Sequence, residues 1–330
     1  MQRAMARGSE AAPSDADPGR PKRRTGGDGS NSKARRRPSW HQLRAGLTTS
    51  GFVVPSLALI VVFFIIPFVF NAGFAFSDWT SFSDAIAFNG LDNFRLITDL
   101  GILGHAIEVT VIYALVVVVV QNVVSLGLAT LLQTPSRRTT FFRTLFFLPV
   151  LISPLAAGYI WSAMLRPNGP VNSAISVLVP GHFDYAWLGN ATSALICTAA
   201  IEAWKWSGLA TLVYVAGLNS VPRPIIEAAT MDGAAGWTRF WRIKVPLLIP
   251  AFTFNLVIGF VGTLSAFDVI MATTSGGPGN ATTVLNVALF QQYGLGFFGN
   301  ASALSLVVTT LVVATAVPLV AFMRRREVAL

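Results

Sequence analysis

Residues 227–246 read Glu-Ala-Ala-Thr-Met-Asp-Gly-Ala-Ala-Gly-Trp-Thr-Arg-Phe-Trp-Arg-Ile-Lys-Val-Pro and form a polar, aromatic interruption between two long apolar runs. Pro222 and Pro224 stand just before it, where they stop the preceding run and favour the start of a new helix. Glu227 is expected in the first turn of that helix, because a negative charge suits the amino end of the helix dipole. Gly233 predicts a left-handed turn that ends the helix.

The second half of this stretch has the spacing of a short amphipathic helix. Trp237, Phe240, Trp241 and Lys244 recur at i, i+3, i+4 and i+7, which predicts one aromatic face. Pro246 is expected to open the next apolar run. Trp and Arg would also suit a helix that lies on a membrane surface. That alternative leaves the small side chains at the start of the stretch unexplained, whereas a closely fitting partner protein would require them.

Apolar runs long enough to cross the hydrocarbon of a bilayer recur along the chain. The protein is 53% hydrophobic and 12% charged, and a span of ~30 Å needs about 20 apolar residues. Six runs meet that need: 52–76, 106–132, 145–165, 194–218, 247–273 and 301–323. The first is too long for a cleaved signal peptide and is followed by too much membrane sequence. The sequence therefore predicts an all-α membrane protein with six transmembrane helices, in a domain that covers residues 51–330.

The net charge of +9 is distributed unevenly along the chain. Residues 1–50 form a basic tail rich in Pro, Gly, Ser and Asp, with too little apolar content to fold, so a disordered tail is predicted. The other basic clusters lie at 137–143, 223–244 and 324–326, and six spans place all of them on the side of the tail. By the positive-inside rule that side is the cytoplasm, which then holds both termini. The tail is expected to contact anionic membrane lipid and not nucleic acid.

Residues that would support catalysis, metal binding or ATP hydrolysis are scarce. A single cysteine, Cys197, excludes an intrachain disulfide and a cysteine-built metal site. His41, His105 and His182 lie far apart in the sequence and are expected to be solvated loop residues. A phosphate-binding P-loop needs Gly directly before its Lys, whereas the lysines at 22, 33, 205 and 244 follow Pro, Ser, Trp and Ile. We therefore expect no catalytic residue, no metal site, and energy supplied by another subunit.

The spacing within 227–246 also resembles a known family signature. Glu-Ala-Ala, three residues, Gly, nine residues, Ile, one residue, an aliphatic residue and Pro resemble the signature loop of permease subunits of bacterial ABC importers, with Val245 where that family usually carries Leu. In that family the loop is cytoplasmic and docks on a separate ATPase. The resemblance thus assigns ATPase coupling to a loop over 219–246. The residues expected at that interface are Glu227, Ala228, Ala229, Asp232 and Gly233.

Further segments narrow the resemblance to carbohydrate-type permeases related to the maltose transporter. These segments are 76–79, 88–94, 141–149 and 274–282. The resemblance implies a bacterial cell-membrane permease that binds no cofactor itself. It also implies alternating access, a sugar substrate, a second permease, two ATPase subunits that hold ATP and Mg, and an external solute-binding protein. Glycerol 3-phosphate stays the alternative, because the turn over 274–278 and Trp204-Lys205 also resemble permeases of that type, and a cationic Lys205 would suit a phosphate.

Charged residues inside spans are costly, so they mark the expected solute path. Glu202 and Lys205 are three apart and can meet on one helix face, either as a self-neutralising structural pair or as part of a cavity wall. Aromatic faces pack on sugar rings, so Trp204 and Trp206 are expected on the same wall, although an interfacial aromatic belt would also explain them. The resemblance supports this stretch and adds small residues of the fifth span. The expected path residues are Trp204, Lys205, Trp206, Leu209, Thr263 and Asp268, the last nearer the outer mouth.

A function from another class would use the same charges. Glu202, Lys205 and Asp268 would serve as a proton relay in a stand-alone, ion-coupled carrier. The loop over 219–246 argues against that carrier, because such a protein has no ATPase to dock, and no second inverted half is evident in the sequence. A membrane-embedded enzyme is weaker still, because no nucleophile and base occur at a plausible spacing.

Overall fold

The computed structural model describes residues 53–179 and 183–327, with side chains up to residue 325. The predicted tail over 1–50, His41 and His182 lie outside the described residues. Residues 59–330 belong to one structural unit, and the packing described below is the packing of that unit.

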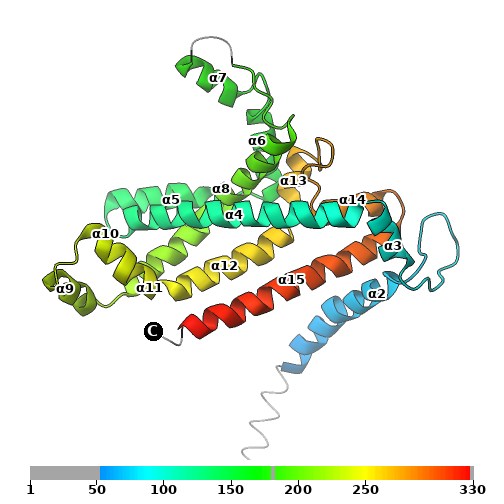
Figure 1. The fold of residues 1–330 in the computed structure, drawn as a ribbon, viewed down its shortest axis with the longest axis horizontal. Coiled ribbons are helices and arrows are strands. Elements are labelled where there is room, and N and C mark those ends of the chain that lie inside the picture. The colour runs from blue at the N-terminus through cyan, green and yellow to red at the C-terminus, as the bar shows by residue number, and fades with distance from the viewer. Residues whose placement is uncertain (1–52, 180–182, 328–330) are drawn as a thin grey trace, which may run out of the picture. The chain divides into compact units, whose positions relative to one another are not determined.

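Regular structure in the described residues is helical, apart from one antiparallel bridge between Ser77 and Phe88. The helices (Figure 1) are η1 (Val61–Ile65), α2 (Ile66–Phe74), α3 (Asp92–Asp99), α4 (Ile102–Leu132), α5 (Arg137–Leu151), α6 (Pro154–Met164), α7 (Pro170–Leu178), α8 (Ala191–Ser220), α9 (Arg223–Met231), α10 (Gly236–Arg239), η2 (Phe240–Lys244), α11 (Val245–Leu247), α12 (Ile249–Leu264), α13 (Asp268–Thr273), α14 (Leu285–Gly294) and α15 (Phe298–Glu327). The predicted all-α class is confirmed.

The helices account for the predicted number of membrane spans. Three are long and apolar enough to cross a bilayer alone: Val53–Phe74, Ile102–Leu132 and Phe298–Arg325. Three more candidates are pairs bent at a short break, namely α5 with α6 at 100°, α8 with α9 at 69°, and Gly236–Leu247 with α12 at 66°. When each bent pair is counted as one span, the described residues provide up to six.

The predicted third span, 145–165, is two helices and not one. α5 ends at Leu151, and α6 begins at Pro154. Proline disfavours helical backbone in the residue before it, and Ser153 is accordingly extended, with ψ of 147°. Its hydroxyl oxygen then accepts a hydrogen bond from the backbone N–H of Ala156 at 3.2 Å, which caps α6. The sharp bend is therefore encoded by the Ser-Pro pair.

The predicted fifth span, 247–273, is also misplaced at both ends. Pro246 lies inside the three-residue helix α11, and Pro250 occupies the first turn of α12, so the expectation that Pro246 opens the span is wrong. α12 ends at Leu264, and the chain resumes helical structure only at Asp268. The break is decisive for the site, because it turns α13 and its first carboxylate toward α8.

α4 and α8 pack along each other and form the centre of the unit (Figure 1). Polar groups tie this contact together: the Tyr113 hydroxyl donates to the Thr198 carbonyl at 3.4 Å, and the Ser125 hydroxyl donates to the Ser207 carbonyl at 2.9 Å. Such bonds between helices are a common means of association in a bilayer, where polar groups find no water. α5 packs on α8 at Gly208, where an added Cβ would overlap the backbone of α5.

The segment 274–282 forms a turn that its own threonines close. The Thr282 hydroxyl donates to the Gly277 carbonyl at 2.8 Å and lies 2.7 Å from the Thr274 hydroxyl. The Nε2 atom of His105 lies 2.9 Å from the carbonyl oxygen of Asn280 in this turn. His105 is exposed, as predicted, but it lies in the first turns of α4 and joins that helix to the turn, so the predicted loop position is wrong.

Candidate functional site

The first half of the 219–246 loop is the helix α9, which begins directly after Pro222 and carries Pro224 in its first turn, as predicted. Glu227 is the fifth residue of α9, so it lies in the second turn, and the predicted first-turn position is wrong. Proline fixes φ near its helical value, so Pro222 at the N-cap and Pro224 in the first turn set the start of the helix one turn earlier than the carboxylate alone would indicate. The Glu227 side chain is exposed.

The end of α9 is a left-handed turn, as predicted. Gly233 has φ of +78°, and the backbone N–H that follows it donates to the carbonyl of Ala229 at 2.9 Å. Nη1 of Arg239 donates to the Thr230 hydroxyl at 3.1 Å and so joins α9 to α10. Ala229 is buried under this turn, whereas Ala228 is exposed. Of the two alanines, only Ala228 therefore offers an outward surface for a partner.

The predicted aromatic face forms, but without its lysine. The rings of Trp237, Phe240 and Trp241 lie with centroids between 5.3 and 6.3 Å apart. The segment changes from α-helix to a π-helical turn at Phe240, and a wider turn moves the i+7 position off the face. Lys244 instead donates to Oε1 of Gln133 at 3.0 Å. The expectation that Lys244 shares the aromatic face is wrong.

Gln133 connects this loop to two long helices. It follows the end of α4, and Arg143 of α5 donates from Nε to the Leu132 carbonyl at 3.0 Å and from Nη2 to the Gln133 carbonyl at 3.2 Å. Arg143 thus satisfies carbonyl groups that the end of a helix leaves unpaired. Because Lys244 holds the side chain of the same Gln133, the loop, α4 and α5 are joined at one residue.

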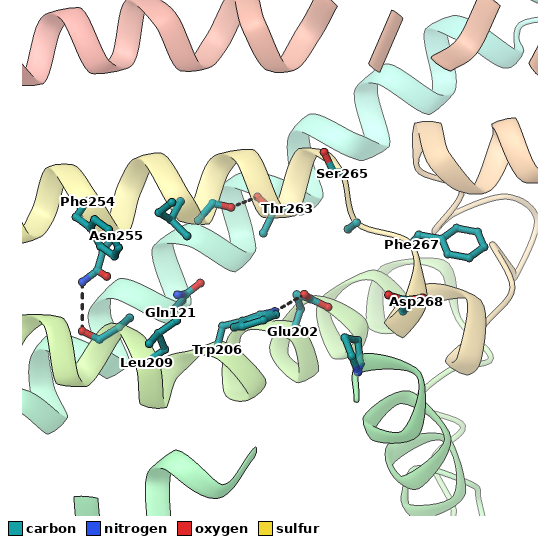
Figure 2. A pocket seen from close by; sticks show the side chains of 16 residues that line it. Gln121, Glu202, Trp206, Leu209, Phe254, Asn255, Thr263, Ser265, Phe267 and Asp268 are labelled. Carbon is teal, nitrogen blue, oxygen red and sulfur yellow. Dashed lines mark hydrogen bonds between the residues drawn. The ribbon is translucent and has the colours of Figure 1, made fainter. Parts of the chain in front are cut away.

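A cavity of about 280 Å³ lies between α8 and α12, with the start of α13 at one end (Figure 2). Its lining includes one face of α8 and one face of α12, and α4 contributes Gln121. Four of the six predicted path residues line it: Trp206, Leu209, Thr263 and Asp268. The structure thus brings together residues from the fourth and fifth predicted spans.

Trp204 and Lys205, the other two predicted path residues, do not line this cavity. Trp204 packs edge-on against Trp161 of α6, with ring centroids 5.4 Å apart. Lys205 is 1% exposed, and its Nζ atom lies 3.4 Å from the carbonyl oxygen of Val150 in α5. The same ammonium lies 4.1 Å from the ring centroid of Trp206. Helix geometry explains the outcome, because consecutive residues point about 100° apart.

The predicted encounter of Glu202 with Lys205 does not form an ion pair. In the part of the chain that the structure describes, the one ion pair joins Asp92 to Arg95 at 3.3 Å. Glu202 faces the cavity and accepts a hydrogen bond at 2.8 Å from the indole N–H of Trp206, four residues later (Figure 2). Glu202 therefore lines the cavity without Lys205, whose Nζ atom lies against the Val150 carbonyl of α5.

Sequence reasoning missed several residues of the cavity wall. Gln121 and Asn255 are polar side chains in otherwise apolar spans, and Nδ2 of Asn255 donates to the Ala210 carbonyl at 3.2 Å. A signal was available: on α12, positions 255, 259, 262 and 263 repeat at helical spacing with polar or small side chains. On α8, positions 202, 206 and 209 repeat in the same way.

Known proteins resemble this chain over most of its length. The family model described as "Binding-protein-dependent transport system inner membrane component" matches residues 121–326. The multiple sugar-binding transport system permease protein MsmF of Streptococcus mutans is 31% identical over 262 residues, which are 77% of this chain and 88% of that protein. The sn-glycerol-3-phosphate transport system permease protein UgpA of Agrobacterium fabrum is 33% identical over 275 residues, 79% of this chain and 89% of that protein.

A solved structure extends the comparison to the fold. The crystal structure of a bacterial ABC transporter involved in the import of the acidic polysaccharide alginate contains a chain that matches with a TM-score of 0.74. The match covers 87% of this chain and 98% of that one, at 20% sequence identity. At this identity the likeness establishes a shared helical fold.

Proposed function

This chain belongs to the family of binding-protein-dependent ABC transporter permeases, and we propose that it forms half of the translocation path of a sugar importer. Permeases of this family are the multi-pass, non-catalytic component of the transporter in the inner membrane. The observation that carries this proposal is the cavity between α8 and α12. It combines one indole, Trp206, with amide, hydroxyl and carboxyl groups. An aromatic face packs on the apolar face of a sugar ring, and the polar groups suit its hydroxyls.

The 219–246 loop is proposed as the element that couples this path to a separate ATPase. Its exposed surface includes Glu227, Ala228, Met231 and Trp237, the last two 88% and 76% exposed. Large apolar side chains at such exposure, beside a small residue, suit a partner surface. Motion of that partner would reach the membrane helices through Gln133, which Lys244 and Arg143 hold.

The same family membership indicates which other subunits the transporter would contain. We propose a second permease that completes the path, two ATPase subunits on the cytoplasmic side, and a solute-binding protein on the outer side. The basic clusters of 137–143 and 223–244 support a cytoplasmic position for the loop and for both termini. ATP binding would then close the ATPases, and α9 would transmit the closure so that the cavity opens alternately to each side.

Glycerol 3-phosphate is the second candidate solute. The 33% identity to UgpA favours it as much as the 31% identity to MsmF favours a sugar. The overall likeness does not separate the two, so the separation rests on the chemistry of the cavity.

Two neighbouring tryptophans offer a matched test of the path. Trp206→Ala removes the indole that lines the cavity, whereas Trp204→Ala removes one that packs on Trp161 outside it. An aromatic contact contributes about 0.5–1.5 kcal/mol beyond its buried area, so ATP-driven sugar uptake should fall about two- to tenfold in Trp206→Ala. Uptake is measured in proteoliposomes that contain the complete transporter, with complex yield and basal ATP hydrolysis as controls. Equal uptake in both variants would contradict the proposed path.

A further inference from the structure

The charged groups of the cavity have one sign. Its lining residues include two carboxyl groups, Glu202 from α8 and Asp268 from the start of α13, and include no Lys, Arg or His. The indole N–H of Trp206 donates to Oε1 of Glu202, which leaves the second carboxyl oxygen for another donor (Figure 2). The polar groups that remain on this wall are amides and hydroxyls, which carry no charge.

The nearest intramembrane cation is turned away from this wall. Nζ of Lys205 lies 3.4 Å from the Val150 carbonyl in α5 and 4.1 Å from the centroid of the Trp206 ring. Trp206 therefore separates the ammonium from a solute in the cavity. The lysine that would have suited a phosphate stabilises the contact of α8 with α5 instead.

Gln121 points to the kind of solute that the wall accepts. Its side chain is 7% exposed and lines the cavity, so its amide can form hydrogen bonds with a solute or with water there. The amide donates two hydrogen bonds and accepts others, as hydroxyl groups require.

We propose that the cavity wall of this chain selects a solute without negative charge, such as a neutral or amino sugar, and discriminates against phosphorylated polyols. This inference rests on the proposed function of the cavity as the path. A phosphate monoester carries about 1.5–2 negative charges at pH 7, and a buried anion needs a paired cation or it is strongly disfavoured. Where a phosphate would need a cation, the wall of this cavity offers the carboxyl groups of Glu202 and Asp268.

The test reads the charge preference of the cavity directly. Ser265→Cys places a thiol in the cavity lining, and Ser275→Cys places one in the exposed turn after α13, both in a Cys197→Ser background. The complete transporter is treated with a cationic and an anionic methanethiosulfonate of similar size, with and without ATP. Modification of this chain is followed by mass spectrometry.

We expect the ratio of cationic to anionic labelling rates to be at least about tenfold higher at Ser265→Cys than at Ser275→Cys, because a concave site of one sign concentrates counter-ions. Glu202→Gln with Asp268→Asn should bring the two ratios together. Equal ratios before that change, faster anionic labelling, or no labelling at Ser265→Cys under either condition would overturn the inference. ATP-driven uptake of sn-glycerol 3-phosphate by the unchanged complex would overturn it as well.

The labelling readout is independent of transport. A charge preference at Ser265→Cys supports the inference even if Trp206→Ala leaves sugar uptake unchanged, a result that would count against the proposed path alone. Conversely, sugar uptake that depends on Trp206, combined with equal labelling ratios, would retain the path and remove the charge selection.

Discussion

Gly233 provides the sharpest perturbation of the coupling loop. Its φ of +78° lies in the left-handed region, and an added Cβ would meet no atom of this chain within 4 Å. Substitution therefore introduces backbone strain without a clash inside the permease. A left-handed conformation disfavours most L-residues by about 1–2 kcal/mol, whereas Asn adopts it more readily. A β-branched residue is expected at the upper end of that range or beyond it.

These values give a graded series for docking on the ATPase. If docking requires the turn, the strain appears in the association constant, and about 1.4 kcal/mol corresponds to a tenfold change. Gly233→Ala should weaken association of the ATPase about fivefold, and Gly233→Val about 30-fold or more, which would abolish uptake. Gly233→Asn should stay within about threefold of the unchanged protein.

Co-purification of the ATPase and solute-stimulated ATP hydrolysis measure the series, with membrane insertion of the permease as the control. Glu227→Ala serves as the comparison at an exposed interface charge, where a loss of only a few-fold is expected. If Gly233→Val keeps full association and transport, the left-handed turn is not needed for coupling. If Gly233→Asn is as damaging as Gly233→Val, the cause is the space that the ATPase leaves at this residue and not backbone strain.

Three further predictions concern the helices and their orientation. Gly208→Val should lower the thermal stability of the complex by the equivalent of about 1–3 kcal/mol, because the valine side chain would overlap α5. Gly127→Val should not lower it, because an added Cβ at residue 127 meets no atom within 4 Å. Equal effects of the two substitutions would refute the close contact. Lys205→Met should reduce the stability or assembly of the complex and leave the half-saturating sugar concentration within about twofold, since the lysine lies outside the cavity and contacts α5. A selective rise in the half-saturating sugar concentration would contradict this structural role of Lys205. In intact cells, an impermeant thiol reagent should label Ser275→Cys from outside and should not label Thr230→Cys, and the opposite pattern would reverse the proposed topology.

The number of spans could be predicted from the sequence because a bilayer imposes one length on apolar helices. Their breaks were not predicted, since each depends on a local detail inside an apolar run. Pro154 stops α5 through the backbone of the residue before it. The break after Leu264 and the π-helical turn at Phe240 have no comparable mark in an apolar pattern.

Only some of the residues that line the cavity were predicted from the sequence. Sequence reasoning reached Trp206 as an aromatic neighbour of Lys205 and reached Thr263 through the family resemblance, and both residues line the cavity. That reasoning failed for Lys205, since a charge in a span indicates a need for partners and does not indicate on which side of the helix they lie. The Val150 carbonyl, which receives that charge, becomes available only because α5 ends nearby.

Protection of the cavity by its solute tests the central claim most directly. The complete transporter carrying Ser265→Cys in a Cys197→Ser background is labelled with a small neutral thiol reagent, in the presence and absence of the sugar that its binding protein delivers and of ATP. The account predicts that the sugar slows labelling at Ser265→Cys severalfold and leaves Ser275→Cys unchanged. Labelling at Ser265→Cys that is insensitive to a sugar which the same vesicles accumulate would contradict the account, because the solute would then cross the membrane by a path that does not include this cavity.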